Sequence, residues 1–361
     1  MKKIISFLLF VSVCITVAAQ DPKKTDFSFT EASELTLIGK IMDTPNPYHR
    51  VDTCVYKGFT ASENRQVRCS AGLAVLFSTD SPIISVKTEY GYQAQHSTTM
   101  TLADRGYDLY IKKDGKWLWA AAKVHGKNNR SNVTLINNMD GTMKDCMLYL
   151  PIYSEEYSVK VGIKDGCTIK PLESPFRHRV AIFGSSFTHG ISTSRAGMSY
   201  PMQFQRRTGI QMLSLGCSGN CKMQPYFADV LADVKADAFV FDAFSNPNAK
   251  MIEARLEPFI KRLSEAHPGA PLIFQQTIYR ESRNFNKSND NKERAKMETA
   301  ERLMKQMMEK YPDVYFIYPN ASSEDHEYSV DGTHPDDHGY FLWEQSIEKP
   351  LLDILAKYGI R

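Results

Sequence analysis

The chain has 361 residues, a length that permits two domains and a sizeable buried core. It is 42% hydrophobic and 24% charged with a formal net charge of +3, which is typical of a globular protein and excludes a disordered or fibrous one. There is no basic stripe and no long run of like charges, so we expect no nucleic-acid partner.

The N-terminus has the pattern of a targeting signal. Lys2 and Lys3 precede an apolar run over residues 4–17, and the small residues that follow suit cleavage by a signal peptidase. We therefore predict a signal peptide over residues 1–19. The mature protein should be exported and should be periplasmic or extracellular.

Two other interpretations compete for this segment. It could anchor the chain in a membrane, but the apolar run is short for a spanning helix. Cys14 could be a lipid-attachment site, but Val13 is bulky where a small residue would be needed. No later segment is apolar and long enough to cross a bilayer, so we expect no stable membrane insertion of the mature chain.

Removal of the signal leaves an even number of cysteines in an exported protein. Three disulfides in fifteen possible pairings would be permitted, and buried free thiols remain an equal alternative. Metal binding is a poor fit because no CxxC pair exists. The cysteines concerned are Cys54, Cys69, Cys146, Cys167, Cys217 and Cys221.

Residues 33–170 are expected to form an all-β sandwich. Short apolar or alternating runs follow one another there, separated by turn residues, and helical periodicity is nearly absent. Lys113-Asp114-Gly115 and Asp140-Gly141 are interpreted as hairpin-type turns. The polar residues 20–32 before this region are expected to be a disordered leader. Examples of the runs are residues 72–77, 83–88, 108–111 and 158–163.

A proline-containing stretch at residues 171–175 is interpreted as a linker, and the pattern changes after it. Apolar β-type runs then alternate with helix-like segments up to residue 361, which predicts a parallel sheet covered on both faces. The expected strands are 180–183, 211–215, 238–242, 271–274 and 314–317. The expected helices are 197–208, 224–234, 249–266, 291–311 and 339–357.

The first of these strands leads directly into Gly184-Ser185-Ser186. A serine just past a strand end, at the start of a helix, can project its hydroxyl into the crevice at the carboxyl ends of the strands. Its own backbone N–H can then help to bind an oxyanion. Taken alone the motif is weak, because Gly/Ser turns after strands often serve only the turn.

A second motif, Asp331-Gly332-Thr333-His334, lies about 150 residues further on. A serine hydroxyl becomes a good nucleophile only when an imidazole removes its proton, and that imidazole needs its other nitrogen held. His334 and Asp331 could supply the base and the group that orients it. The alternative is that Asp331 merely shapes a turn while His334 precedes a helix.

Two further loops follow strand ends in the same half. One contains Gly219, where a glycine lets backbone N–H groups approach a ligand closely. The other contains Asn246, whose side-chain amide can donate to a developing oxyanion. Each of these loops has the composition of an ordinary turn. The interpretation as a catalytic site depends on finding all four loops, each after the strand or helix expected before it.

The order of Ser186, Gly219, Asn246 and His334 resembles the four-block pattern of the SGNH/GDSL hydrolases over about residues 178–361. The resemblance implies a flavodoxin-like three-layer α/β/α catalytic domain. It also implies a catalytic Ser186, Asp331 and His334, with an oxyanion hole formed by Ser186, Gly219 and Asn246. No cofactor and no metal are implied.

The upstream region resembles a second family feature. Gly106-Tyr107-Asp108-Leu109-Tyr110 looks like the GxDLY signature of a β-rich domain that precedes some bacterial SGNH esterases, and residues 150–153 also look like part of it. Proteins of this arrangement are generally regarded as esterases, often of carbohydrate esters. For Asp108 and Tyr110 we expect plain packing within a strand rather than a chemical role.

Two positions depart from the family pattern, and a third lies close to the candidate nucleophile. Ser185 stands where the family name implies aspartate, and Pro247 follows Asn246 where aspartate is usual. Both raise the question of what replaces the missing carboxylates. His189 follows Ser186 by three residues and could line the pocket, but we expect it simply to lie at the helix start.

Together these features predict an exported serine esterase that hydrolyses carboxylic esters of an acylated small molecule or a glycan, with O-acetyl or other short acyl groups on carbohydrates as the expected substrates. The sequence does not determine its oligomeric state. One alternative is a non-catalytic glycan-binding protein with a degenerate hydrolase domain. Another is a metal site at His334 and His338, which are spaced i and i+4, with oxygen ligands from Asp331, Asp336 or Asp337.

Overall fold

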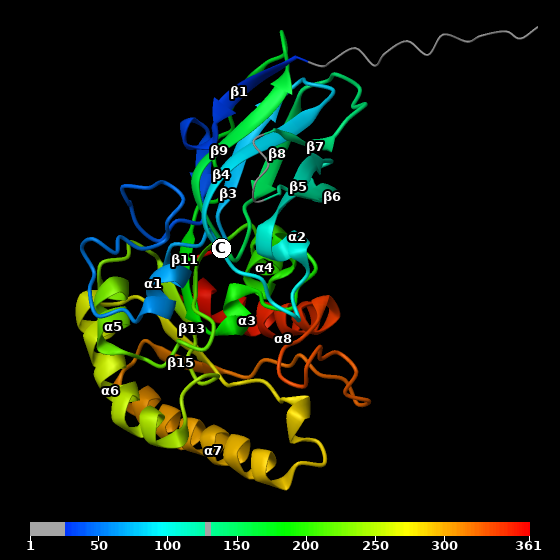
Figure 1. Ribbon diagram of the computed structural model, residues 1–361. Helices are drawn as coiled ribbons and strands as arrows, with labels where there is room; N and C mark the ends of the chain where they lie inside the picture. Colours follow the sequence, from blue (N-terminus) through cyan, green and yellow to red (C-terminus); the bar gives the residue numbers. More distant parts are fainter. Residues whose placement is uncertain (1–25, 127–130) are drawn as a thin grey trace, which may run out of the picture.

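The computed structural model describes residues 26–126 and 131–361, and the predicted signal peptide at residues 1–19 lies outside them. A β-rich part, at the top of Figure 1, is followed by an α/β part below it. The fold class expected from the sequence, a β sandwich followed by a three-layer α/β/α arrangement, is confirmed. Among the described residues no helix is both long and apolar enough to cross a membrane.

Two antiparallel sheets form the β-rich part. One has the strand order β1-β9-β4-β7 and the other β10-β3-β8-β5-β6, with β2 paired to β3. Side chains from both sheets, among them Val75, Leu148 and Val161, form a shared buried cluster, as the inner faces of a sandwich do. The strands are β1 (Phe27–Glu31), β2 (Thr36–Ile38), β3 (Ala74–Thr79), β4 (Ile84–Gln93), β5 (Gly106–Lys113), β6 (Lys116–Val124), β7 (Val133–Ile136), β8 (Lys144–Tyr149), β9 (Ser154–Lys164) and β10 (Ile169–Pro171).

In the α/β part, a parallel sheet has the strand order β12-β11-β13-β14-β15. This is a flavodoxin-like doubly wound order. The direction in which successive strands are added to the sheet reverses at β11, and such a reversal opens a crevice at the carboxyl ends of the strands. Both β11, which leads to Ser186, and β13, which leads to Asn246, end at that crevice. The strands are β11 (Arg179–Gly184), β12 (Gln211–Gly216), β13 (Ala238–Asp242), β14 (Leu272–Gln275) and β15 (Val314–Ile317).

Helices cover both faces of this parallel sheet. The helices α4 and α8 pack together on one face, while α5, α6 and α7 follow one another across the other (Figure 1). The helices expected from the sequence are all present, with ends shifted by a few residues. They are α4 (Tyr200–Thr208), α5 (Pro225–Ala232), α6 (Ala249–Ala266), α7 (Lys287–Lys310) and α8 (Asp337–Ala356), and the structure adds the short helix α3 (Ser186–His189) after β11.

Successive residues of β11 point to opposite faces of the sheet and so belong to different cores. Ile182 lies in the cluster beneath α4 and α8, and Phe183 lies in the cluster beneath α5, α6 and α7. The first cluster continues into the β-rich part through Leu76 and Met147. The two parts are therefore joined by a common apolar core, which holds the crevice of the parallel sheet against the sandwich.

The expectation of a disordered leader over residues 20–32 is wrong for its described end. Residues 27–31 form strand β1, which pairs antiparallel with β9 and extends one sheet at its edge. The residues of this strand are mostly polar because an edge strand exposes much of its surface. Phe27 and Phe29 alternate with Ser28 and Thr30, a period-2 pattern typical of a strand, and the strand pairs with β9, a partner more than a hundred residues away.

Two further local predictions for the β-rich part need correction. Helix α1 (Ala61–Val67) interrupts it, with Thr60 and Glu63 forming a capping box whose sequence pattern marks a helix start. A short helix α2 (Thr101–Arg105) also occurs. Asp140-Gly141 does not close a hairpin, because β7 before it pairs with β4 and β8 after it pairs with β3 and β5. The turn at Asp114-Gly115 does close the β5–β6 hairpin, with φ of +50° and +78°.

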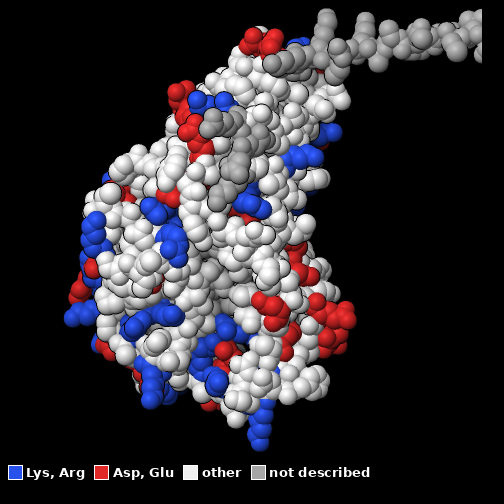
Figure 2. All heavy atoms as spheres, viewed as in Figure 1, with Lys and Arg blue, Asp and Glu red and all other residues white. Residues whose placement is uncertain are grey.

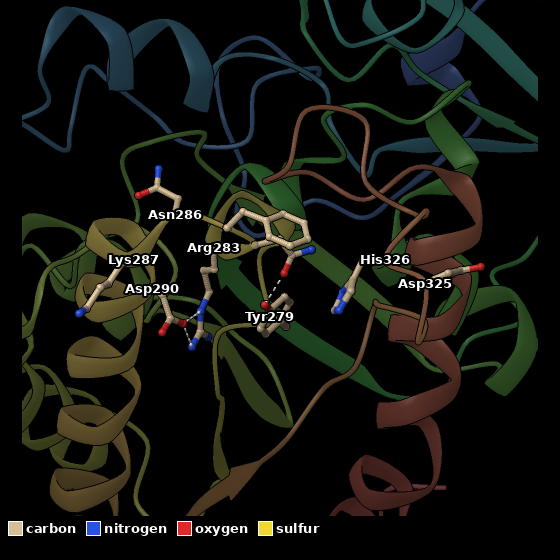
Figure 3. A pocket seen from close by; sticks show the side chains of 9 residues that line it. Tyr279, Arg283, Asn286, Lys287, Asp290, Asp325 and His326 are labelled. Carbon is tan, nitrogen blue, oxygen red and sulfur yellow. Dashed lines mark hydrogen bonds and ion pairs between the residues drawn. The ribbon is translucent and has the colours of Figure 1, made fainter.

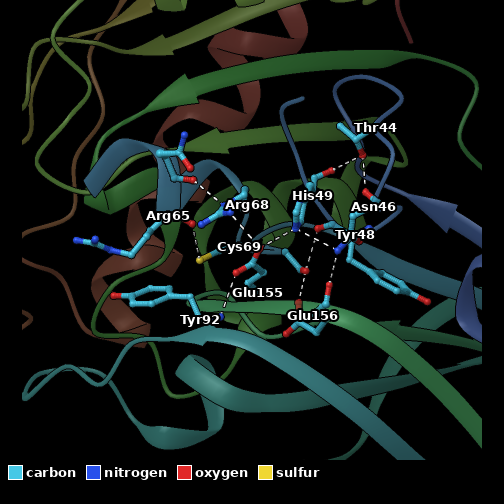
Figure 4. Close-up of polar contacts among 12 residues, drawn as sticks. Thr44, Asn46, Tyr48, His49, Arg65, Arg68, Cys69, Tyr92, Glu155 and Glu156 are labelled. Carbon is cyan, nitrogen blue, oxygen red and sulfur yellow. Dashed lines mark hydrogen bonds and ion pairs between the residues drawn. The ribbon is translucent and has the colours of Figure 1, made fainter. Parts of the chain in front are cut away.

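A buried polar cluster ties the long loop before α1 to strand β9 (Figure 4). The carboxylate of Glu155 lies 2.9 Å from Nε2 of His49 and 3.5 Å from Nε of Arg68. Its neighbour Glu156 is fully buried and accepts a hydrogen bond from Ser70, and burial raises the pKa of this carboxyl well above its ordinary value. These contacts hold the loop against the sandwich beside the α/β part.

The cysteines left after residue 20 are all free thiols in the described chain. Cys69, Cys146, Cys217 and Cys221 are buried, Cys167 is half-buried and Cys54 is exposed. The sequence left disulfides and free thiols open as alternatives, and the structure has free thiols. Burial raises the pKa of Cys217 to about 12, which keeps that thiol protonated and unreactive.

Candidate active site

Ser186 is the first residue of α3, immediately after the end of β11. Ser185 caps the helix, since its hydroxyl accepts a hydrogen bond from the N–H of Phe187 at 3.2 Å. The turn requires Gly184, because a Cβ there would lie 1.9 Å from Oγ1 of Thr188. The N–H of Ser186 has no acceptor inside the helix, as holds for every first helical residue, and remains available to a ligand.

His334 and Asp331 lie in the long loop between β15 and α8. The loop is pinned by the N–H of Val330, which donates to the carbonyl of His334 at 2.8 Å. Oδ1 of Asp331 accepts from the backbone N–H groups of Thr333 and His334 at 2.9 and 2.8 Å, and Oδ2 lies 2.8 Å from Nδ1 of His334. The imidazole is thus held by its own loop.

Nε2 of His334 lies 2.9 Å from Oγ of Ser186. Because Asp331 accepts a hydrogen bond from Nδ1–H of His334, the proton of the neutral imidazole stays on Nδ1 and Nε2 presents its lone pair to the serine hydroxyl. Partial burial raises the pKa of the Asp331 carboxyl, but the hydrogen bonds from the side chain and the backbone of His334 together lower it by more. The pKa of this carboxyl is therefore below its ordinary value, and the group is ionised. Such an arrangement can activate a hydroxyl for attack on a carbonyl carbon.

The two expected oxyanion donors lie on the loops after β12 and β13. Gly219 has a φ of +71°, a left-handed conformation that favours glycine, and open space surrounds the position of a Cβ there. Oδ1 of Asn246 accepts from the N–H of Cys221 at 3.1 Å. This bond fixes the orientation of the amide and turns its NH₂ group away from Cys221, where it can serve as a donor.

A carboxylate that the sequence analysis did not single out lies behind Ser186. Asp242, at the end of β13, is buried and accepts from the N–H and the hydroxyl of Ser185 at 3.0 and 2.6 Å. It also accepts from Thr188 at 3.2 Å and from the hydroxyl of Ser245. The carboxylate missing at position 185 therefore has a counterpart at 242. The available signal was an aspartate closing an otherwise apolar strand.

Asp242 connects the nucleophile turn with the loop that carries Asn246. Burial raises the pKa of its carboxyl, while the hydrogen bonds from Ser185 and Ser245 lower it, and the net shift is upward. On the far side, the carbonyl of Ser245 accepts from the guanidinium of Arg280 and, at 3.4 Å, from Nζ of Lys296. Both sides of the crevice are thereby held by one buried polar network.

The GxDLY strand reaches into the α/β part, so the expectation of plain strand packing for Asp108 and Tyr110 is incomplete. Asp108 is fully buried and accepts from the Arg195 guanidinium at 2.8 Å and from the N–H of Gly197 at 2.9 Å. Tyr110 also accepts from Arg195. Because Arg195 lies in the segment that follows α3, the contact joins the β-rich part to the region of Ser186.

His189 closes α3 rather than lying at its start, and it is buried rather than lining an open pocket. Its Nε2 lies 2.7 Å from the carbonyl oxygen of Ile152, and its ring stacks on Tyr153 at a centroid distance of 4.0 Å. Tyr153 in turn bonds through its hydroxyl to Ser218, next to Gly219. The segment 150–153 thus supports two of the crevice loops.

The residues considered for a metal site have other partners. His334 faces Ser186 and Asp331, and His338 packs on the ring of Tyr328 at 4.3 Å. Asp336 caps α8, accepting from the N–H of Gly339 at 2.8 Å. Within residues 26–126 and 131–361, no three His, Cys, Asp or Glu side chains are placed to share a metal ion.

Comparison with known proteins adds the family. The GDSL-like lipase/acylhydrolase family matches residues 177–352, and the N-terminal GxDLY domain of SGNH-type esterases matches residues 27–169. No curated protein matches. Over 92% of this chain and 98% of the other, the fold is similar to a crystal structure described as a GDSL-like lipase from Bacteroides ovatus, with 36% identity and a TM-score of 0.88.

Two more distant structures share the fold. The salicylyl-acyltransferase SsfX3 from a tetracycline biosynthetic pathway has 18% identity and a TM-score of 0.72, over 93% of this chain and 99% of that one. A family two carbohydrate esterase from Cellvibrio japonicus has 10% identity and a TM-score of 0.58, over 92% and 99%. By the identity and coverage of the Bacteroides ovatus structure and by the two family matches, the chain belongs to the GDSL-like lipase/acylhydrolase family and is an ester hydrolase.

Proposed function

We propose that the protein is an exported serine esterase that removes short acyl groups, acetyl above all, from carbohydrates. The observation that carries the proposal is the 2.9 Å contact between Oγ of Ser186 and Nε2 of His334, with Asp331 on the opposite ring nitrogen. The carbohydrate esterase and the acetyl xylan esterase from Butyrivibrio proteoclasticus that share the fold support this class of substrate. The signal-like residues 1–19 support export.

The reaction proceeds by two acyl transfers. Ser186 Oγ attacks the ester carbonyl carbon while His334 Nε2 takes the hydroxyl proton, and the resulting oxyanion is held by the N–H groups of Ser186 and Gly219 and by the Asn246 side chain. His334 then gives the proton to the departing alcohol oxygen as the ester C–O bond breaks. A water molecule repeats the sequence on the acyl-enzyme, and a carboxylic acid is released.

Hydrolysis of p-nitrophenyl acetate tests the chemistry. Wild-type protein should show turnover, whereas Ser186→Ala should lose it while keeping the wild-type circular dichroism spectrum and melting temperature. Mass spectrometry of rapidly quenched wild-type protein should find an acetyl group on the peptide that contains Ser186. Full activity of the alanine variant would remove Ser186 from the mechanism.

The same experiment separates an esterase from a glycan-binding protein with an inactive hydrolase part. The latter would bind oligosaccharides and show no ester turnover even before mutation. Export is tested by expression of the full chain followed by cell fractionation and N-terminal sequencing. A mature chain that begins at Gln20 is expected, and a chain retained in the cytoplasm with Met1 intact would contradict it.

A further inference from the structure

A cavity opens beside the loop that carries Asp331 and His334. It has a volume of about 670 Å³, within the range of small-molecule pockets, which is roughly 300–1,000 Å³. Its walls come from the segment after β14, the start of α7 and the loop after β15 (Figure 3). The lining residues that matter below are Tyr279, Arg283, Phe285, Lys287, Asp325 and His326.

The chain next to this cavity is bonded to the loop of the candidate active site, through the residue that precedes the lining residue Arg283. The N–H of Ser282 donates to the carbonyl of Gly332, the residue after Asp331, at 2.6 Å. The guanidinium of Arg280 lies 5.5 Å from the ring centroid of Phe187, which follows Ser186. The cavity also shares a loop with the candidate active site, because its lining residues Asp325 and His326 lie in the same β15–α8 loop as Asp331 and His334.

Aromatic and polar groups line the cavity together. The rings of Tyr279 and His326 lie 5.1 Å apart, and the guanidinium of Arg283 lies 4.7 Å from the Tyr279 ring centroid. The Tyr279 hydroxyl donates to Oδ1 of Asn284 at 2.6 Å. These contacts order the wall, so that ring faces and amide groups stand in fixed positions in the absence of a ligand.

Phe285, at the edge of the cavity, is fully exposed, with a relative accessibility of 109%, and its φ is +59°. A bulky side chain in the left-handed region is strained, and such strain concentrates at ligand-binding sites. The turn is well tied, since the N–H groups of Asn284 and Asn286 donate to Glu281 and Arg283 at 2.8 and 3.1 Å. An ordered structure thus holds an apolar ring out in solvent.

The charges around the cavity balance. Arg283 forms an ion pair with Asp290 through Nη2 at 2.6 Å and Nε at 2.8 Å, which neutralises the inner wall. Lys287 and Asp325 lie on opposite walls in Figure 3 and carry opposite signs. Figure 2 likewise shows both acidic and basic groups on the lower part of the molecule. Such a cavity suits a neutral ligand rather than an anion or a cation.

A neutral ligand with apolar ring faces and many hydroxyl groups matches these walls, because its faces stack on aromatic rings while its hydroxyls bond to amides and charged groups. We propose that this cavity is a sugar subsite, which binds a part of the carbohydrate that lies beyond the acylated residue. This inference rests on the proposed function, in that it names where the alcohol portion of the ester is held.

The test compares two esters in the same variants. Phe285→Ala removes a fully exposed ring at the edge of the cavity. Tyr279→Leu removes an aromatic ring from the cavity wall. Tyr157→Ala, at a 58%-exposed tyrosine of β9, is the matched control. The substrates are acetylated xylo-oligosaccharides and p-nitrophenyl acetate, and kcat and KM are measured for each.

For Phe285→Ala and Tyr279→Leu, the loss in kcat/KM on the oligosaccharide should exceed the loss on p-nitrophenyl acetate by about five- to tenfold, mainly through KM, as expected for the loss of one aromatic contact. Tyr157→Ala should leave this ratio at its wild-type value. Equal losses on both esters, or no loss on either, would overturn the subsite.

Direct binding distinguishes failure of the subsite from failure of the proposed function. Xylohexaose and cellohexaose are titrated calorimetrically into Ser186→Ala and into Ser186→Ala combined with Phe285→Ala. Binding weakened by the second change supports the subsite even if the protein proves not to be a serine esterase. If neither sugar binds while wild-type protein hydrolyses p-nitrophenyl acetate, the esterase proposal stands and the subsite is wrong.

Discussion

Asp242 accepts hydrogen bonds from both the backbone N–H and the hydroxyl of Ser185, at 3.0 and 2.6 Å. The residue before the candidate nucleophile is thus held by a buried carboxylate that belongs to the neighbouring strand β13. In this chain a serine and a distant aspartate together occupy the place where the family name implies one aspartate. The position of Ser186 therefore depends on the pairing of β11 with β13.

Asp242→Asn should weaken this attachment, because the amide NH₂ group cannot accept the hydrogen bonds that one carboxylate oxygen now receives. We expect a loss of about 1.5–3 kcal/mol in the free energy of unfolding, the usual contribution of a hydrogen bond to a charged group, and a fall in kcat with little change in KM. Urea unfolding and p-nitrophenyl acetate kinetics measure the two effects. Asp229→Asn, at a 61%-exposed side chain of α5, is the control, and a similar response of both variants would contradict the positioning role.

Asn246→Ala should remove one oxyanion donor. Because the donor acts on charge that develops in the transition state, kcat should fall by about 10²–10³-fold with KM nearly unchanged. Asn248→Ala, two residues further on, removes only the cap of α6 and should cost about 1 kcal/mol of stability without a comparable loss of kcat. Wild-type turnover by Asn246→Ala would exclude Asn246 from the oxyanion hole.

Asp108→Asn should destabilise the junction between the β-rich part and the α/β part. Breaking a buried ion pair leaves its partner uncompensated, and with Arg195 only 19% exposed we expect a loss of about 3 kcal/mol in the free energy of unfolding. Glu253→Gln breaks a pair in which both side chains are about half exposed, and it should change stability by less than about 1 kcal/mol. Thermal and urea unfolding compare the two, and equal effects would reject a special role for Asp108.

His189 should make the protein less stable in mild acid. Burial first, and then the charge of Arg50, lower its pKa well below the ordinary value, so the imidazole stays neutral in the folded chain while it takes up a proton in the unfolded chain. The unfolded state then binds more protons below about pH 6.5, and stability falls as the pH decreases from there by up to about 1.4 kcal/mol per pH unit. His189→Gln has no imidazole at this position, so it lacks this contribution to the pH dependence of stability.

The measurement for His189 is the free energy of unfolding of wild-type protein and His189→Gln between pH 5 and pH 8. The difference between them should be constant at and above about pH 7.5 and should shift in favour of the variant as the pH falls below about 6.5. Parallel curves over the whole range would show that His189 does not titrate on unfolding.

The alternation of strands and helices after residue 178 was predictable because it rests on local patterns. Apolar runs such as 180–183 and 238–242 are long enough to be buried strands, and the 3.6-residue period marks the helices between them. The sequence motifs also named Ser186, Asp331 and His334, which the structure brings within hydrogen-bond distance. Their catalytic roles remain the prediction that the experiments above address.

Other features depend on contacts between residues far apart in the chain, and local patterns do not encode those contacts. Strand β1 pairs with β9, more than a hundred residues away in the chain, and the turn at Asp140-Gly141 joins different sheets because β7 and β8 have other partners. Likewise, the carboxylate of Asp242 meets Ser185 only after β11 and β13 pair.

The class of each half, the order of its elements and the loops that bear reactive side chains could be predicted from the sequence, because hydrophobic period and turn chemistry are properties of neighbouring residues. Three features depend on the assembled fold: Asp108 pairs with Arg195, His189 is buried against Tyr153, and a cavity adjoins the loop of Asp331. Burial and hydrogen-bond partners are set by packing over the whole chain, and so they appear only once the sheets and helices are assembled.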